Sequence, residues 1–267
     1  MKYFLKPCLF LALPVLLLFS CDQEEIIELD LSGAPAQYVI EGRVTDEAVP
    51  FQVRISRTVD VYHSNDFPAV RSAVVTISDD SGQVDTLLET TPGVYETADA
   101  IPGVSGRTYT LQVWVEGRYF VAHSTMPALV PFTDLRAIPL PFGGTNTLVM
   151  TPVFNDPAGL GNNYQFVQSN NGVRLPNIFV ADDRNTDGSQ VSTLLIAPEM
   201  ETKRGDTVLV EMRNIDRATY KYFVALDASN GNGPNASVPA NPDNNFEGAC
   251  LGYFSAYTVQ RKSVVVE

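Results

Sequence analysis

Residues 109–123 read Tyr-Thr-Leu-Gln-Val-Trp-Val-Glu-Gly-Arg-Tyr-Phe-Val-Ala-His and show the pattern of a β-hairpin. Before the turn, apolar side chains recur at every second position: Tyr109, Leu111, Val113 and Val115. Successive side chains of a strand point to opposite faces, so these four share one face. Glu116-Gly117 supplies a two-residue turn into the returning strand. We therefore expect a hairpin with one apolar side that faces a core.

Strand patterns continue on the N-terminal side of this hairpin. Phe51, Val53 and Ile55 alternate with polar residues in the same way. In total, seven short strands separated by turns are expected within residues 37–128. Such a series is typical of a β-sandwich. The remaining expected strands are Gln37–Val44, Ala73–Ser78, Val84–Glu89 and Val94–Glu96.

Residues 129–267 are expected to form a second, β-rich domain, which follows a boundary in a proline-containing connector. One helix is predicted near residues 216–228, because Asp216 suits an N-terminal cap and good helix formers follow it. Tyr220, Phe223 and Val224 have the spacing of one helix face that could cover a sheet. The predicted fold class is mainly β, with a β-sandwich followed by a β-rich domain that contains one helix.

The N-terminus has the pattern of a bacterial lipoprotein signal peptide over residues 1–20. Two lysines precede the apolar run Cys8–Phe19, which is shorter than the roughly 20 residues that span a bilayer. Ser20 directly precedes Cys21, which resembles a lipobox, although Phe19 is larger than the residue usual there. We therefore expect cleavage before Cys21 and a diacylglycerol on its thiol. The alternatives are an ordinary signal peptide cut near Ser20 and a retained membrane anchor.

An acidic run follows the expected lipid anchor at once. Asp22, Glu24 and Glu25 resemble the export signal that sends lipoproteins of Bacteroidota-type cells to the cell surface. The alternative is a solvated linker, because like charges repel each other and keep a segment extended. In both cases residues 21–36 form an acidic, flexible tether.

Composition limits the possible partners and cross-links. The formal net charge of −13 argues against nucleic-acid binding, which needs clustered cations. Cys8 leaves with the signal peptide and Cys21 is lipidated, so only Cys250 remains in the mature chain. One thiol forms neither an internal disulfide nor a cysteine-based zinc site, and it excludes the paired cysteines of an antibody-type domain.

Catalytic patterns are weak, and we expect no enzyme. The chain has two histidines, His63 and His123, and adjacent strand residues such as His123 and Ser124 point to opposite faces. The sequence contains no Gly-x-Ser-x-Gly elbow. The acidic pairs at residues 79–80 and 182–183 fall in expected turns, where acidic residues are common.

A calcium-loop pattern occurs at Asp183, Asn185 and Asp187, followed by Gly188. However, the twelfth position holds Leu194 in place of the bidentate glutamate, and no helices are expected on either side. We therefore interpret the segment as the polar tip of a hairpin and keep it as a weak calcium candidate. No other cofactor is expected.

Trp114 and Tyr119 are candidates for a ligand-binding surface. Trp114 lies on the strand face opposite Leu111, Val113 and Val115, so we expect it to point away from the core. An outward aromatic pair could stack on a sugar or contact a partner. The alternatives are a second buried face and isolated surface aromatics.

A series of turn-and-strand motifs runs along the mature chain: Val39–Gly42, Ala73–Asp79, Pro92–Tyr95, Gly106–Leu111, Asp156-Pro157 with Asn163-Tyr164, Asp216–Phe223 and Gly252–Phe254. In the order of these motifs, the chain resembles a family of Bacteroidota outer-membrane lipoproteins known only as a domain of unknown function. The resemblance covers nearly all of the mature chain and implies a first domain that is Ig-like or transthyretin-like. It carries over no catalytic residues.

Genes of that family often neighbour TonB-dependent transporters, so the resemblance implies a transporter as partner. We therefore expect a surface-exposed lipoprotein, anchored in the outer membrane by its lipid, that assists nutrient capture without catalysis. A surface enzyme that hydrolyses glycans or peptides and an adhesion or envelope-structure module are the alternatives.

Overall fold

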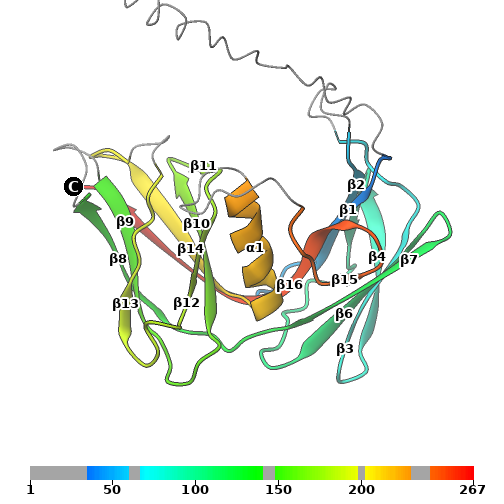
Figure 1. The fold of residues 1–267 in the computed structure, drawn as a ribbon, viewed down its shortest axis with the longest axis horizontal. Coiled ribbons are helices and arrows are strands. Elements are labelled where there is room, and N and C mark those ends of the chain that lie inside the picture. The colour runs from blue at the N-terminus through cyan, green and yellow to red at the C-terminus, as the bar shows by residue number, and fades with distance from the viewer. Residues whose placement is uncertain (1–34, 60–66, 141–147, 198–201, 230–240) are drawn as a thin grey trace, which may run out of the picture.

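The computed structural model describes residues 35–59, 67–140, 148–197, 202–229 and 241–267. Within these residues the chain is mainly β with one helix, α1 (Arg217–Ser229), which confirms the predicted fold class (Figure 1). The strands form a 13-stranded sheet and a separate three-stranded sheet. None of the described helical residues forms a segment long and apolar enough to cross a membrane.

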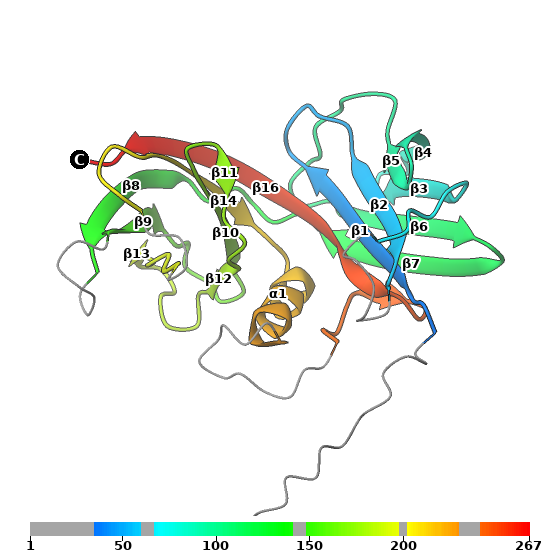
Figure 2. The same ribbon diagram turned by 90° about the horizontal axis from the view of Figure 1, so that it is seen from above.

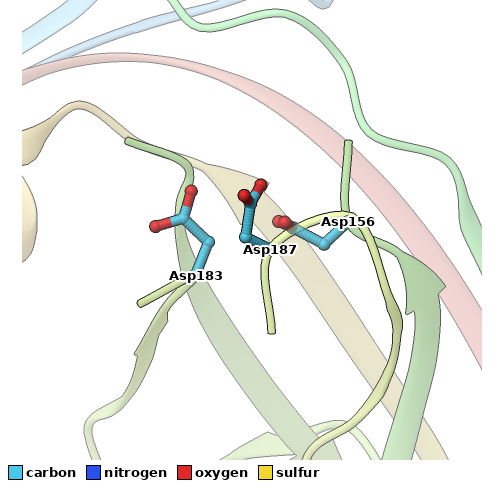
Figure 3. A group of neighbouring side chains, drawn as sticks. All are labelled: Asp156, Asp183 and Asp187. Carbon is cyan, nitrogen blue, oxygen red and sulfur yellow. The ribbon is translucent and has the colours of Figure 1, made fainter. Parts of the chain in front are cut away.

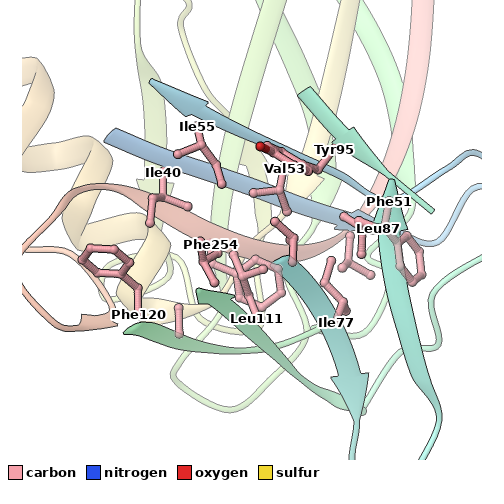
Figure 4. Close-up of a cluster of buried hydrophobic side chains, with 14 of the residues drawn as sticks. Ile40, Phe51, Val53, Ile55, Ile77, Leu87, Tyr95, Leu111, Phe120 and Phe254 are labelled. Carbon is pink, nitrogen blue, oxygen red and sulfur yellow. The ribbon is translucent and has the colours of Figure 1, made fainter. Parts of the chain in front are cut away.

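The first lobe is a sandwich whose two layers face each other across an apolar core (Figure 4). Ile40, Val53 and Ile55 come from one layer, and Ile77 and Leu111 come from the other. All five are buried, because every second residue of each strand turns inward. One layer contains β1 (Tyr38–Thr45), β2 (Gln52–Arg57) and β5 (Val94–Glu96); the other contains β4 (Val84–Thr91), β3 (Val74–Asp79), β6 (Thr108–Val115), β7 (Arg118–Thr125) and β15 (Phe246–Glu247).

The hairpin of β6 and β7 has the predicted register. Trp114 pairs with Tyr119 and Val115 with Arg118, so Glu116 and Gly117 form the two-residue turn. Both turn residues have positive φ, 48° and 74°, which is the conformation that tight hairpin turns require.

The second lobe packs the continuing sheet against the three-stranded sheet. Phe154, Phe166 and Met212 are fully or almost fully buried in its core. The continuing sheet contains β10 (Asn163–Asn170), β11 (Val173–Arg174), β12 (Phe179–Asp182) and β14 (Thr207–Asn214); the smaller sheet contains β8 (Phe132–Pro139), β9 (Leu148–Asn155) and β13 (Gln190–Ser192).

Strand β16 (Leu251–Val265) runs through both lobes (Figure 2). Its first half pairs in parallel with β1, where Val39 lies opposite Leu251, and its second half pairs antiparallel with β14. Phe254 is fully buried in the core of the first lobe. This differs from the expected division into residues 37–128 and 129–267, because the C-terminal segment completes the first sandwich.

Gly252 permits the close approach of β16 to β1. Its φ is 102°, and a Cβ atom there would lie 2.0 Å from the carbonyl oxygen of Ile40. A side chain at this position would therefore collide with the backbone of β1. The joint between the lobes depends on a glycine at the start of the last strand.

Candidate functional site

A cleft of about 590 Å³ opens where the two lobes meet, between helix α1 and the strands beside it. Its lining comes from β1, β2 and β5 of the first lobe, from β11, β14 and α1 of the second, and from β16, which belongs to both. In both views α1 lies beside the middle of β16 (Figures 1 and 2). Ligand sites are typically hollows of about 300 to 1,000 Å³ and often lie between domains. This cleft is therefore the candidate site.

Strands β1 and β2 supply the side of the cleft that belongs to the first lobe. Glu41 and Arg43 are the exposed residues of β1, and Arg54 is exposed between the buried residues Val53 and Ile55 of β2. Glu41 and Arg54 are direct cross-strand partners. The alternation that buries the apolar side chains in the sandwich therefore turns these charged side chains outward, into the cleft.

Aromatic rings form the facing wall. The ring centroids of Tyr222 and Phe223 on α1 lie 5.4 Å apart. Tyr253 of β16 lies 5.2 Å from Tyr222 and 4.9 Å from Phe223, measured between centroids. These separations are typical of packed aromatic side chains. The three rings fix α1 against β16 and line the cleft.

The start of α1 is tied to both lobes by one carboxylate. Asp216 accepts a hydrogen bond from the backbone N–H of Thr219 at 2.7 Å, which is the predicted N-terminal cap. The same carboxylate accepts a hydrogen bond from the hydroxyl of Ser124 in the first lobe. The cap therefore also holds the helix beside the first lobe.

The predicted packing face of the helix is partly wrong. Phe223 is buried as expected, but Val224 is 41% exposed. Thr219, one turn before Phe223, is the other buried residue of the helix. The reason is that α1 lies at the border of an open cleft and buries only a narrow side, so Val224 faces solvent.

Arg213 of β14 is held in a fixed place in the lining. Its guanidinium lies 2.5 Å from a carboxylate oxygen of Glu211 and donates a hydrogen bond to Gln165 Oε1 at 3.2 Å. The guanidinium carbon lies 4.7 Å from the centroid of the Tyr257 ring. Such a cation–π contact, together with the ion pair, orders the guanidinium before any ligand arrives.

The cleft tyrosines keep their hydroxyl protons at neutral pH. Burial, with a contribution from the nearby Glu41 carboxylate, raises the pKa of Tyr222 to about 12. The same two causes, burial first, raise the pKa of Tyr253 to about 12. Both hydroxyls therefore remain hydrogen-bond donors to a ligand over the physiological range.

A second group of functional side chains lies in the second lobe, where Asp156, Asp183 and Asp187 come together (Figure 3). One carboxylate oxygen from each lies within 4.8 Å of the others, and Asp156 and Asp183 are buried. Carboxylate oxygens are the preferred ligands of calcium, so these three residues could hold a divalent cation. Asn185, the other residue of the sequence pattern, is exposed.

Hydrogen bonds account for the positions of these carboxylates. Asp183 accepts from the backbone N–H groups of Gly161 and Asn162 at 2.6 and 2.7 Å. Asp187 accepts from the backbone N–H of Gly159 at 2.6 Å. The segment after β12 is thereby fastened to the turn after β9. The predicted hairpin is wrong, because β12 pairs with β10 and β13 pairs with β9, so this segment connects the two sheets of the second lobe.

Asp156 is not part of the calcium-loop pattern at residues 183–188, because it lies in a turn that is distant from them in the sequence. Its carboxylate accepts hydrogen bonds from the hydroxyl of Tyr164 and, at 3.3 Å, from the backbone N–H of Gly188. Burial and the neighbouring Asp156 carboxylate raise the pKa of Tyr164 well above its usual value. The Asp156-Pro157 turn is visible in the sequence, but nothing in the sequence indicates that it lies beside Asp183.

Trp114 and Tyr119 point outward, as the alternation predicts. Their side chains are 53% and 48% exposed, and their ring centroids lie 6.0 Å apart on neighbouring strands. The exposed residues Val74 and Leu88 extend the row across β3 and β4. The structure does not bring these residues into the cleft. Their role in ligand binding stays a prediction.

The histidine and serine at the end of β7 lie on opposite faces. His123 is exposed and its Nδ1 lies 2.9 Å from the hydroxyl of Thr110. Ser124 is buried and accepts a hydrogen bond from the backbone N–H of Ala256 at 2.8 Å. This pair therefore does not form a nucleophile and base.

Several sequence-predicted residues lie outside the described part of the chain. They are His63, the lipidation residue Cys21 and the acidic residues Asp22, Glu24 and Glu25. The signal peptide and most of the tether lie in the same undescribed segment.

Three solved structures illustrate the similarity to other proteins. A segment of two fibronectin type III domains from chicken tenascin covers 67% of this chain and 91% of its own, with 12% identity and a TM-score of 0.24. A chain of a cytokine receptor complex covers 86% and 97%, with 11% identity and a TM-score of 0.26. The chicken interferon gamma receptor alpha chain covers 68% and 90%, with 8% identity and a TM-score of 0.22.

Among curated proteins, none matches the sequence. A family model described as "Domain of unknown function (DUF4249)" matches residues 24–263. The match therefore spans both lobes and the cleft between them.

Proposed function

This chain belongs to the DUF4249 family, a domain of unknown function, and we propose that it is a non-enzymatic binding module anchored in the outer membrane by a lipid. The bound ligand occupies the cleft between the lobes. A TonB-dependent transporter is the partner that receives the ligand, in the service of nutrient capture.

The cleft is the observation that carries this proposal. Strands β1 and β2 of the first lobe and helix α1 of the second supply facing sides, and β16 crosses both lobes. The hydrogen-bonded pairing of β16 with β1 and β14 fixes the spacing of the two sides. A preformed hollow of this kind binds a ligand without a cost for ordering mobile segments.

The anchor and the location rest on the sequence. Cys21 follows a signal-peptide pattern, and the acidic residues after it resemble a surface-export signal. A lipid on Cys21 would leave the folded lobes at the membrane surface at the end of a tether. That arrangement suits a module that presents ligand to a membrane transporter.

Affinity purification of the lipidated protein from outer membranes tests the proposal. We expect a large β-barrel protein to co-purify with the wild-type chain. The Cys21→Ser variant serves as control, and it should appear in the soluble fraction without the barrel. Recovery of the chain alone, together with turnover of glycan or peptide substrates, would contradict the proposal and support a surface hydrolase.

The export signal is tested separately. Neutralising Asp22, Glu24 and Glu25 together should leave lipidation intact but protect the chain from protease added to whole cells. Unchanged cleavage of the variant would show that the acidic run is only a linker.

A further inference from the structure

The cleft concentrates positive charge in an otherwise acidic protein. Its lining contains four arginines and one acidic residue, Glu41. The whole chain has a formal net charge of −13. We propose that the cleft binds a small ligand that carries an oxyanion: a carboxylate, a sulfate or a phosphate ester. This inference rests on the proposed function, since it names the ligand class of the same cleft. The four arginines are Arg43, Arg54, Arg174 and Arg213.

Most other arginines are already neutralised by neighbouring carboxylates. Within the described residues, eight of the thirteen arginines form ion pairs. Of the five without one, Arg43, Arg54 and Arg174 line the cleft. Of the other two, Arg118 lies over the ring of Tyr38 at 5.7 Å, and Arg204 lies in a turn before β14. Three of the five described arginines that lack a carboxylate partner therefore line the same cleft.

These cations approach the cleft from both lobes. Arg43 and Arg54 lie on neighbouring strands of the first lobe, where Arg43 pairs with Gln52 and Arg54 with Glu41. Arg174 belongs to β11 of the second lobe. A bound anion would be contacted from two sides, and planar guanidinium groups bind carboxylate, sulfate and phosphate oxygens with paired hydrogen bonds.

The remaining polar groups of the lining agree with an anionic ligand. Tyr222 and Tyr253 keep their protons because burial raises the pKa of each to about 12. Arginine side chains donate hydrogen bonds and accept none, and the tyrosine hydroxyls can donate as well. Glu41 is the one carboxylate of the lining and lies opposite Arg54 in the sheet. A site rich in donors favours a ligand rich in acceptors.

The size of the cleft favours a small ligand over a long polymer chain. About 590 Å³ accommodates a ligand of a few sugar units or a short peptide. The strongly acidic net charge of the rest of the molecule disfavours long polyanions, because like charges repel outside the cleft. We therefore expect recognition of one or a few oxyanions on a compact ligand.

Isothermal titration calorimetry of the mature, full-length chain tests this inference with four probes. They are a galacturonate trimer, its neutral methyl ester, inorganic sulfate and inorganic phosphate. We expect at least one anionic probe to bind, and the methyl ester to bind at least about tenfold more weakly than the trimer if carboxylate is the ligand group. Raising the salt from about 50 to about 500 mM should weaken the binding, because exposed charges are screened.

The double variant Arg54→Gln/Arg174→Gln should lower the affinity for the bound anion at least about tenfold. Arg204→Gln is the matched control, because Arg204 also lacks an ion pair but does not line the cleft. Both variants should keep the wild-type melting temperature, and the salt dependence of the wild-type chain provides evidence that needs no variant.

Two outcomes overturn the inference. If none of the three anions binds, or if the trimer is the only anion that binds and its methyl ester binds as tightly, the cleft does not select an oxyanion. A neutral ligand found in the cleft together with a co-purifying barrel would leave the proposed function standing. Loss of the barrel partner with intact anion binding would instead overturn the transporter role alone.

Discussion

Replacing Phe254 by alanine should destabilise the whole molecule, although this residue lies near the C-terminus. The Phe254 side chain is fully buried in the core of the first lobe. Its ring packs so closely over Gly42 that a Cβ atom on that glycine would lie 2.8 Å from ring atom Cδ2. Gly42 has no side chain that could fill the space left by the ring.

The expected loss is about 3 to 5 kcal/mol in the free energy of unfolding, because truncation of a buried phenylalanine removes apolar contacts and leaves a cavity. For a protein of this size each kcal/mol shifts the melting temperature by about 2 to 4 °C. The expected decrease is therefore roughly 6 to 20 °C. Val265→Ala is the matched control on the same strand, since Val265 is 58% exposed. The control should change stability by less than about 0.5 kcal/mol.

Urea unfolding followed with two signals measures the effect. Trp114 is the only tryptophan and lies in the first lobe, so its fluorescence reports that lobe. Far-ultraviolet circular dichroism reports the strands of both lobes. Since β16 pairs with β1 and with β14, we expect both signals of Phe254→Ala to shift together.

Two results would refute this reasoning. A loss below about 1 kcal/mol would show that Phe254 does not carry the core contacts assigned to it. A shift of the fluorescence transition alone, with a separate unshifted transition in circular dichroism, would show that the shared strand does not couple the lobes.

Three further perturbations test the joint, the cleft and the carboxylate group. Gly252→Ala should lower the free energy of unfolding by about 1 to 3 kcal/mol, because residue 252 has a positive φ and an added Cβ atom would collide with the backbone of Ile40. An unchanged urea midpoint would contradict this prediction. In spectrophotometric titration, Tyr222 and Tyr253 should ionise near pH 12. The pKa of a tyrosine in the unfolded chain is about 10. The contribution of these two protonated tyrosines to the stability of the fold is therefore complete below pH 10 and is lost as the pH rises towards about 12. Ionisation of every tyrosine near pH 10 in the folded protein would exclude the buried cleft wall. Asp183→Ala should cost about 1 to 3 kcal/mol by leaving two backbone N–H groups without their acceptor, whereas millimolar calcium should leave the wild-type melting curve unchanged. A rise in the melting temperature with calcium would assign the carboxylates to a cation site.

Local patterns predicted the parts of this structure that depend on neighbouring residues. The alternation around Leu111 determined which side of the strand is buried, and it correctly turned Trp114 outward. Asp216 marked the start of the helix, since a capping carboxylate acts within one helical turn. These features arise from the geometry of a single strand or helix.

The tertiary structure alone decided which distant segments meet. Alternation assigns a residue to a face but does not name the strand that pairs beside it, so the sharing of β16 between both lobes was not predictable from its own sequence. For the same reason Asp156 was not placed beside Asp183, and Arg54 and Arg174 were not placed across one cleft. Contacts between residues far apart in the chain are selected by the packing of the whole core, because only burial of the shared apolar faces offsets the entropy lost in bringing such segments together.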